Sequence, residues 1–130
     1  MGSVPKVTVL PALTILVVED DPDLLRFAQA TLRLQGYRTL TAVDGTDAVA
    51  LLAKRRIHGV VLDLQLPGID GYGVLRWLRN EPRLAALPVV IVSALPPPPP
   101  DGRTWYVPKP ASAESLLETV ANALASQPSD

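Results

Sequence analysis

Three apolar runs constrain the fold of this chain more than any other feature of its sequence. ILVV (15–18), VVLDL (60–64) and PVVIV (88–92) do not alternate between apolar and polar residues. A strand with one face in water alternates, whereas a strand buried on both faces is apolar throughout. Strands of that kind belong to parallel sheets with helices on both sides, so the runs predict an α/β fold.

Segments with helical spacing separate these runs. Capping residues and the proline and glycine positions mark where they begin and end. Two weaker strands are predicted over 37–42 and 104–107, which gives five strands in all. Four helices are predicted, from Asp21 to Gly36, from Asp44 to Arg56, from Asp70 to about Asn80 and from Ser112 to Leu124. The apolar stripe of the first contains Leu24, Leu25, Ala28, Leu32 and Leu34. That of the last contains Leu116, Leu117, Val120, Ala121 and Leu124.

Composition narrows the class of protein. The chain has 130 residues, which is enough for one domain, predicted over 14–126 between a flexible segment (1–13) and a short tail (127–130). Its 12 basic and 13 acidic residues leave a net charge of −1, which argues against nucleic-acid binding. It has no cysteine, which fits a reducing compartment, and its apolar N-terminal stretch is too short to span a membrane. We expect a cytoplasmic protein without a membrane partner.

Polar residues gather where the predicted strands end. Glu19 and Asp20 follow the first strand, Asp63 lies near the end of the third, Ser93 follows the fourth and Lys109 follows the fifth. The carboxyl ends of parallel strands meet at one edge of the sheet, where chemistry gathers in such folds. Carboxylates brought together there repel one another unless a cation lies among them, and Mg²⁺ is the simplest hard, oxygen-ligated choice.

This set of groups suits phosphoryl transfer. A carboxylate can attack phosphorus while a metal ion, an ammonium group and a hydroxyl neutralise the phosphoryl oxygens, and the product is an aspartyl phosphate. Considered singly, each residue has a simpler interpretation. Ser93 would cap a strand end and Lys109 would be a surface lysine. Their occurrence together favours a phosphoryl site.

Four segments, ILVVEDDPDLL, VVLDLQLPGIDG, VIVSA and YVPKP, resemble the signature segments of the response regulator receiver domain of two-component signalling, in the same order and from about Thr14 to Leu124. The resemblance implies a flavodoxin-like doubly wound sheet of five parallel strands in the order 2-1-3-4-5. It also implies a helix between the fourth and fifth strands, and a cis peptide bond before Pro110.

The resemblance also implies a role for each site residue. Asp63 would be the phosphoacceptor, and Lys109 and Ser93 would contact the phosphoryl group. Mg²⁺ would be bound by Glu19, Asp20, Asp63 and the backbone carbonyl of Gln65. Ser93 and Tyr106 would form the switch that responds to phosphorylation, although plain packing on the last strand is the alternative for Tyr106. His58 is interpreted as a surface residue, and the basic clusters that include Arg76, Arg79 and Arg83 as solvated helix faces.

Five consecutive prolines occupy the place of the helix between the fourth and fifth strands. Only ten residues, 94–103, connect these strands. A polyproline II segment of five residues spans ~15 Å, close to the ~17 Å of a five-residue strand. We therefore predict that an extended proline rod replaces the helix and that the partner-binding surface is rebuilt. A rod that acts only as a spacer and a rod that docks into an aromatic groove of SH3 type both remain open.

Three functions are compatible with these residues. The first is a single-domain phosphoacceptor that receives its phosphoryl group from a sensor histidine kinase or a histidine phosphotransfer protein and signals to an unidentified downstream protein. The alternative is that the chain is a domain excised from a longer protein. The second is a pseudo-receiver that binds partners without phosphorylation. The third is a metal-dependent phosphatase with Asp63 as nucleophile, which would need a catalytic acid that Leu64-Gln65 does not offer.

Overall fold

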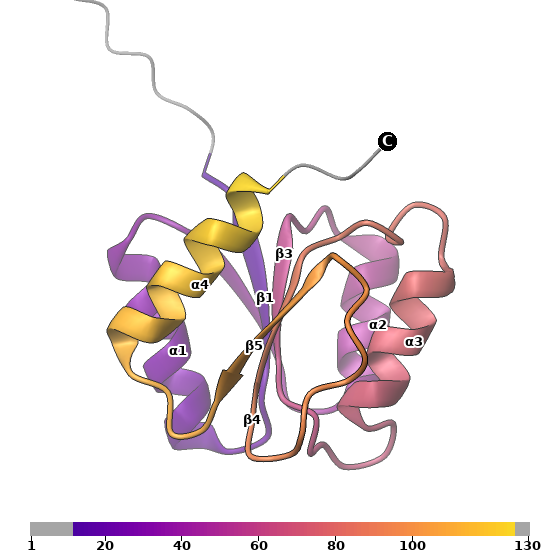
Figure 1. Cartoon of the computed structure of the whole chain (residues 1–130), viewed down its shortest axis with the longest axis horizontal. Helices are drawn as coiled ribbons and strands as arrows, with labels where there is room; N and C mark the ends of the chain where they lie inside the picture. Colours follow the sequence, from indigo (N-terminus) through magenta and orange to yellow (C-terminus); the bar gives the residue numbers. More distant parts are fainter. Residues whose placement is uncertain (1–11, 127–130) are drawn as a thin grey trace, which may run out of the picture.

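The computed structural model describes residues 12–126 and shows the predicted α/β fold (Figure 1). One parallel sheet holds five strands in the order β2-β1-β3-β4-β5, as expected. The expected flexible segment and tail lie almost wholly outside the described residues. The strands are β1 (Thr14–Val18), β2 (Arg38–Ala42), β3 (Gly59–Leu62), β4 (Val89–Ser93) and β5 (Thr104–Pro108), and the helices of the described region are α1 (Pro22–Leu34), α2 (Gly45–Lys54), α3 (Gly71–Asn80) and α4 (Ala113–Ala125).

The helices lie in two layers, one on each face of the sheet. Figure 1 shows α1 and α4 on one side and α2 and α3 on the other. Side chains of the central strands alternate between the two resulting cores: Leu16 packs with the α2 and α3 side, and Ile15 with the α1 and α4 side. Both faces of β1 and β3 are therefore buried, which explains why these strands are apolar without alternation.

Helix α1 shows where the sequence pattern was sufficient and where it was not. The Asp21 side chain caps it by accepting hydrogen bonds from the Asp23 and Leu24 N–H groups, and Gly36 follows its end with a positive φ of 93°. The expectation that Leu24 and Leu34 belong to the buried stripe is wrong, because they are 40% and 87% exposed. Leu24 lies in the first turn of α1 and Leu34 is its last residue, so both stand at the ends of the helix.

His58 is more buried than the sequence predicted. It was expected at the surface, but it is half-buried just before β3, and its Nδ1 accepts a hydrogen bond from the Thr14 N–H at 3.0 Å. The imidazole thus ties the start of β1 to the loop before β3. It lies at the amino edge of the sheet, far from the strand ends where the predicted site lies.

The connection between β4 and β5 contains no helix, as predicted. We call residues 94–103 the proline crossover. It leaves the end of β4 and returns to the start of β5 on the side of α3 (Figure 1). Two tyrosines fix its first part: the Tyr72 hydroxyl donates to the Pro96 carbonyl and the Tyr106 hydroxyl to the Leu95 carbonyl, both at 2.7 Å.

Arg79 fixes the other end of the proline crossover. Its Nε pairs with Asp101 Oδ2 at 2.7 Å, and its terminal nitrogens donate to the carbonyls of Leu87 at 2.7 Å and Arg103 at 2.8 Å. A further bond reaches Thr104 Oγ1 at 2.9 Å. The interpretation of Arg79 as part of a solvated helix face is therefore wrong, because its guanidinium joins α3 to the start of β5.

The Arg79–Asp101 pair predicts how stability depends on acid. Burial alone would raise the pKa of Asp101, but hydrogen bonds from Arg79, from the Arg103 N–H and from Thr104 outweigh it and hold the pKa below the usual 3.8. A carboxylate with a lowered pKa stabilises the fold above its ordinary pKa and loses that contribution as pH falls through the folded-state pKa. We expect Asp101→Asn to be less stable than the wild type at neutral pH, and the two stabilities to converge below pH 3.8.

Urea denaturation between about pH 2.5 and about pH 7 measures this difference. Asp23→Asn is the matched control, since Asp23 also pairs with an arginine, Arg26, but is 87% exposed. The control should show no convergence of this kind. Parallel curves for Asp101→Asn and the wild type across the whole range would contradict the prediction.

Candidate functional site

Four strand ends bring the predicted polar residues to one edge of the sheet. Parallel pairing sets the register: the Asp63 N–H donates to the Val18 carbonyl and the Lys109 N–H to the Ser93 carbonyl, both at 3.0 Å. Glu19, directly after β1, therefore lies beside Asp63. We call Glu19, Asp20, Asp63, Ser93 and Lys109 the carboxylate site.

Gly71 allows helix α3 to begin directly against this site. A Cβ atom at position 71 would overlap the Asp63 carbonyl oxygen and lie 2.5 Å from the Leu64 Cα. Both are backbone atoms and cannot rotate away. The absence of a side chain thus lets the Gly71 N–H donate to the Leu64 carbonyl at 2.9 Å and holds the loop that carries Asp63.

We expect Gly71→Ala to destabilise the fold by about 2 kcal/mol, because an added methyl group in a filled space forces the backbone to shift. Gly73→Ala is the matched control, two residues further along α3. Its Cβ would lie 2.9 Å from the Ile69 Cγ2, which belongs to an exposed side chain that is free to move, and 3.4 Å from the Asp70 Oδ1, an ordinary contact. Urea denaturation should therefore show little loss, or a gain from helix propensity, for Gly73→Ala. Equal effects of the two substitutions would contradict this account of Gly71.

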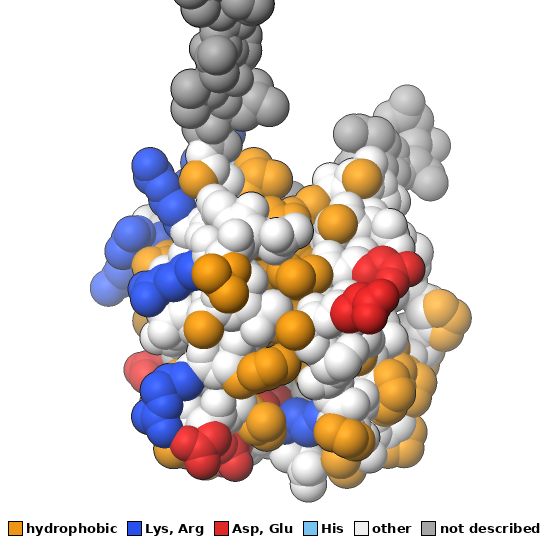
Figure 2. Space-filling model, turned by 90° about the vertical axis from the view of Figure 1, so that its left-hand side faces the viewer, with side chains coloured by type: hydrophobic (Ala, Val, Ile, Leu, Met, Phe, Trp, Pro, Cys, Tyr) orange, Lys and Arg blue, Asp and Glu red, His pale blue; other side chains and the backbone are white. Residues whose placement is uncertain are grey.

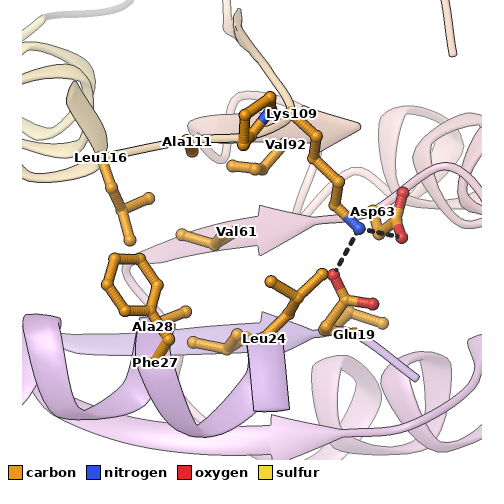
Figure 3. Close-up of a pocket in the computed structure, with 13 residues that line it drawn as sticks. Glu19, Leu24, Phe27, Ala28, Val61, Asp63, Val92, Lys109, Ala111 and Leu116 are labelled. Carbon is orange, nitrogen blue, oxygen red and sulfur yellow. Dashed lines mark hydrogen bonds and ion pairs between the residues drawn. The ribbon is translucent and has the colours of Figure 1, made fainter. Parts of the chain in front are cut away.

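Lys109 joins the two buried carboxylates of the site. Its Nζ lies 2.7 Å from Glu19 Oε1 and 2.9 Å from Asp63 Oδ2 (Figure 3). Glu19 and Asp63 are only 6% and 4% exposed. Two carboxylates this close to each other are tolerated because the ammonium group lies between them.

The protonation of these groups follows from their burial. Burial raises the pKa of Glu19, and this effect exceeds the lowering by the hydrogen bond from Lys109. Burial alone would lower the pKa of Lys109, but hydrogen bonds to Glu19 and Asp63 outweigh it and raise the pKa above its usual value. Lys109 is therefore a permanent cation at neutral pH, fixed on the Asp63 carboxylate.

The other oxygen of Asp63 is also held in place. The buried Ser93 hydroxyl donates to Asp63 Oδ1 at 2.8 Å, and the Gln65 N–H donates to the same atom at 3.1 Å. The Ser93 oxygen in turn accepts from the Leu95 N–H at 3.2 Å, at the start of the proline crossover. Tyr106 is half-buried, and its hydroxyl reaches the Leu95 carbonyl rather than Asp63.

Three carboxylates form a potential cation site. Glu19, Asp20 and Asp63 each present an oxygen, and these oxygens lie within 4.8 Å of one another. Asp20 is exposed, so its carboxylate is available to a ligand that enters from solvent. Lys109 supplies one positive charge against three negative ones. Hard oxygen donors and an excess of negative charge suit Mg²⁺, so the residues present fit the ion that the sequence predicted.

An apolar pocket of about 300 Å³ lies between α1 and α4 beside the carboxylate site. Figure 3 shows Lys109 and Glu19 at one end of it and Phe27 and Leu116 at the other. Figure 2 faces the same side of the molecule and shows hydrophobic side chains exposed along it. Leu24 and Phe27, at the pocket, are 40% and 41% exposed. Phe27 was not among the predicted site residues; it lies five positions after Pro22, the first residue of α1.

Comparison with known proteins agrees with this geometry. A family model described as the response regulator receiver domain matches residues 15–99. This chain belongs to that family. The receiver domain is also 32% identical over 119 residues to the protein PilH of Pseudomonas aeruginosa, which covers 85% of this chain and 97% of PilH. Receiver domains are signalling phosphoacceptors that act with histidine kinases, so the phosphatase alternative is set aside.

Other relatives are longer. The response regulator PleD of Caulobacter vibrioides is 38% identical over 89 residues, and the match covers 68% of this chain but only 18% of PleD. The receiver domain thus spans less than a fifth of that relative. Among solved structures, the receiver domain of the sensor histidine kinase PA1611 from Pseudomonas aeruginosa, with a magnesium ion coordinated in its active-site cleft, gives a TM-score of 0.80 at 28% identity and covers 89% of this chain and 100% of that one.

The structure brings five of the seven predicted site residues together and places the other two at the margin. The Lys109–Pro110 peptide bond is cis, as the resemblance implied. Gln65 contributes its N–H group, while Tyr106 lies one step away through Leu95.

Within residues 12–126, none of the helices combines the length and the apolar character that crossing a bilayer requires.

Proposed function

We propose that Asp63 is the phosphoacceptor of a two-component or phosphorelay system. The observation that supports this most directly is the environment of its carboxylate. Both oxygens accept hydrogen bonds, one from Ser93, the last residue of the neighbouring strand β4, and one from Lys109, which directly follows β5. A carboxylate held in this way needs little reorganisation before it reacts.

The proposed reaction transfers a phosphoryl group from a phosphohistidine to Asp63. An oxygen of Asp63 attacks phosphorus and forms the O–P bond of an acyl phosphate. The bond from phosphorus to the donor nitrogen of a phosphohistidine breaks, and its electron pair stays on the departing imidazole. Lys109 Nζ and Ser93 Oγ are placed to transfer their hydrogen bonds from Asp63 to the phosphoryl oxygens as charge develops there.

We assign the binding of Mg²⁺ to Glu19, Asp20 and Asp63, with the Gln65 carbonyl as a further expected ligand. The PA1611 receiver domain, which holds a magnesium ion in its cleft, supports this assignment. When bound, the ion neutralises charge on the phosphoryl oxygens. The role of Glu19 toward Lys109 does not depend on the ion, since their contact at 2.7 Å keeps the ammonium group over the site.

A histidine kinase or a histidine phosphotransfer protein is the proposed donor. The donor histidine must reach Asp63, which is 4% exposed, so the donor has to pack closely around the site. Leu24 and Phe27 offer exposed apolar surface next to it. We propose that this rim of the pocket contacts the donor, and that an unidentified protein receives the signal.

Intact mass after incubation with acetyl phosphate tests the proposal. The wild type should gain one phosphoryl group with Mg²⁺ present and none after EDTA treatment, and peptide mapping should place the group on Asp63. Isothermal calorimetry with Mg²⁺ alone should show binding by the same protein. No mass gain together with no Mg²⁺ binding would favour the alternative, a pseudo-receiver that binds its partner without phosphorylation.

A further inference from the structure

The five prolines of the crossover differ in their exposure. Pro96, Pro97, Pro99 and Pro100 are exposed, while Pro98 is half-buried. Leu95 and Asp101, three positions before and after Pro98, contact the body of the domain: Leu95 packs on the core, and Asp101 pairs with Arg79. A polyproline II helix has three residues per turn, so one of its three ridges faces the domain and two face solvent.

Hydrogen bonds fix both ends of this segment. Tyr72 and Arg79 lie seven residues apart on α3 and bond to Pro96 and Asp101, respectively. A helix rises ~1.5 Å per residue, so the two anchors lie ~10 Å apart along α3. Five prolines in polyproline II span ~15 Å, long enough to reach from one anchor to the other. The prolines between the anchors are thus ordered before any partner arrives.

We propose that Pro96–Pro100 is a docking ligand for a partner protein whose groove is lined with aromatic side chains. Such grooves bind polyproline II segments by packing rings against two adjacent proline ridges. The ridges 96/99 and 97/100 are the two that face solvent here. Because the rod is already held in shape, little conformational entropy is lost when it binds.

The chemistry of the rod favours this partner over others. Proline has no N–H group, so the rod cannot pair with a sheet edge. Residues 94–100 carry no charge, and the one carboxylate that follows, Asp101, is occupied by Arg79. This leaves apolar rings and carbonyl oxygens as the exposed groups. A function as spacer alone explains the length of the segment, but it does not require four of the five prolines to face water.

A titration with purified polyproline-binding domains tests this proposal. The probes are a WW domain that binds uninterrupted prolines, an SH3 domain and profilin, each added to the isotope-labelled full chain. Carbon-detected NMR follows the proline rings, which amide detection cannot see. We expect saturable shifts confined to residues 95–101 with at least one probe, in unphosphorylated protein and without Mg²⁺. Loss of phosphorylation therefore cannot mimic failure of docking.

Two variants distinguish specific docking of the prolines from nonspecific binding. Pro97→Ala/Pro100→Ala removes one exposed ridge and should weaken binding at least tenfold, whereas Pro82→Ala, an exposed proline elsewhere, should bind as the wild type does. The double variant should keep its amide spectrum outside the proline crossover and still accept a phosphoryl group, which shows that it is folded. No saturable shift with any probe at millimolar concentration, or equal binding by the double variant, would overturn the proposal.

Discussion

Replacing Asp63 by asparagine should abolish the gain of a phosphoryl group from acetyl phosphate. The amide has nearly the same shape and keeps one oxygen to accept the Ser93 hydrogen bond. It is not a nucleophile at neutral pH, and it removes one of the three carboxylates of the cation site. We expect no covalent phosphate by intact mass at times when the wild type is fully modified.

Asp23→Asn is the control for this loss. Asp23 is a carboxylate at the start of α1, next to the same edge of the sheet, but it is 87% exposed and bonds only within its own helix. This variant should gain one phosphoryl group at the wild-type rate. Continued phosphorylation of Asp63→Asn at another carboxylate, such as Asp20, would show that the wrong residue has been assigned.

Arg79→Ala should lower the free energy of unfolding by about 3 kcal/mol, a large share of the stability of a domain this size. The arginine is 17% exposed on its side chain and donates to Asp101, to three carbonyls and to a hydroxyl. Its removal leaves those acceptors without their donor, and each buried group left unpaired costs about 1–3 kcal/mol before solvent compensates. Urea denaturation at neutral pH measures the difference.

Arg76→Ala is the matched control on the same helix. Arg76 is exposed, and the change should shift stability by less than about 0.5 kcal/mol. Amide exchange supplies a second measurement, because Arg79→Ala should raise exchange at the start of β5 more than in β1. If both arginine variants lose the same stability, Arg79 is not the anchor of the proline crossover.

The strands and the carboxylate site were predictable from the apolar runs, whereas the strand order was implied by the resemblance to receiver domains. Continuous apolar runs mark strands with two buried faces, and the residues that follow such runs must lie at the carboxyl edge of the sheet. Asp63, Ser93 and Lys109 were found in this way. The replacement of a helix by the proline crossover was also predictable, since ten residues that include five prolines can form little else.

Features that depend on one long side chain reaching another element were not predictable. Arg79 has the sequence context of a solvated arginine, but its acceptors are the carbonyls of Leu87, just before β4, and of Arg103, just before β5. His58 was misjudged because its partner, the Thr14 N–H, lies 44 positions away in the chain. The pocket beside the site depends on how far α1 and α4 stand apart, a distance that no local pattern encodes.

The two ends of the described domain lie at the edge of the sheet opposite the carboxylate site. Strand β1 starts there, and the last turn of α4 reaches the same edge, where Arg103 donates to the Ser126 carbonyl at 3.2 Å (Figure 1). Both ends of the described residues therefore lie away from Asp63 (Figure 1). The chain ends of the domain thus lie at one edge of the sheet and the carboxylate site at the other. The domain can be joined to other sequences without blocking the approach of a phosphoryl donor.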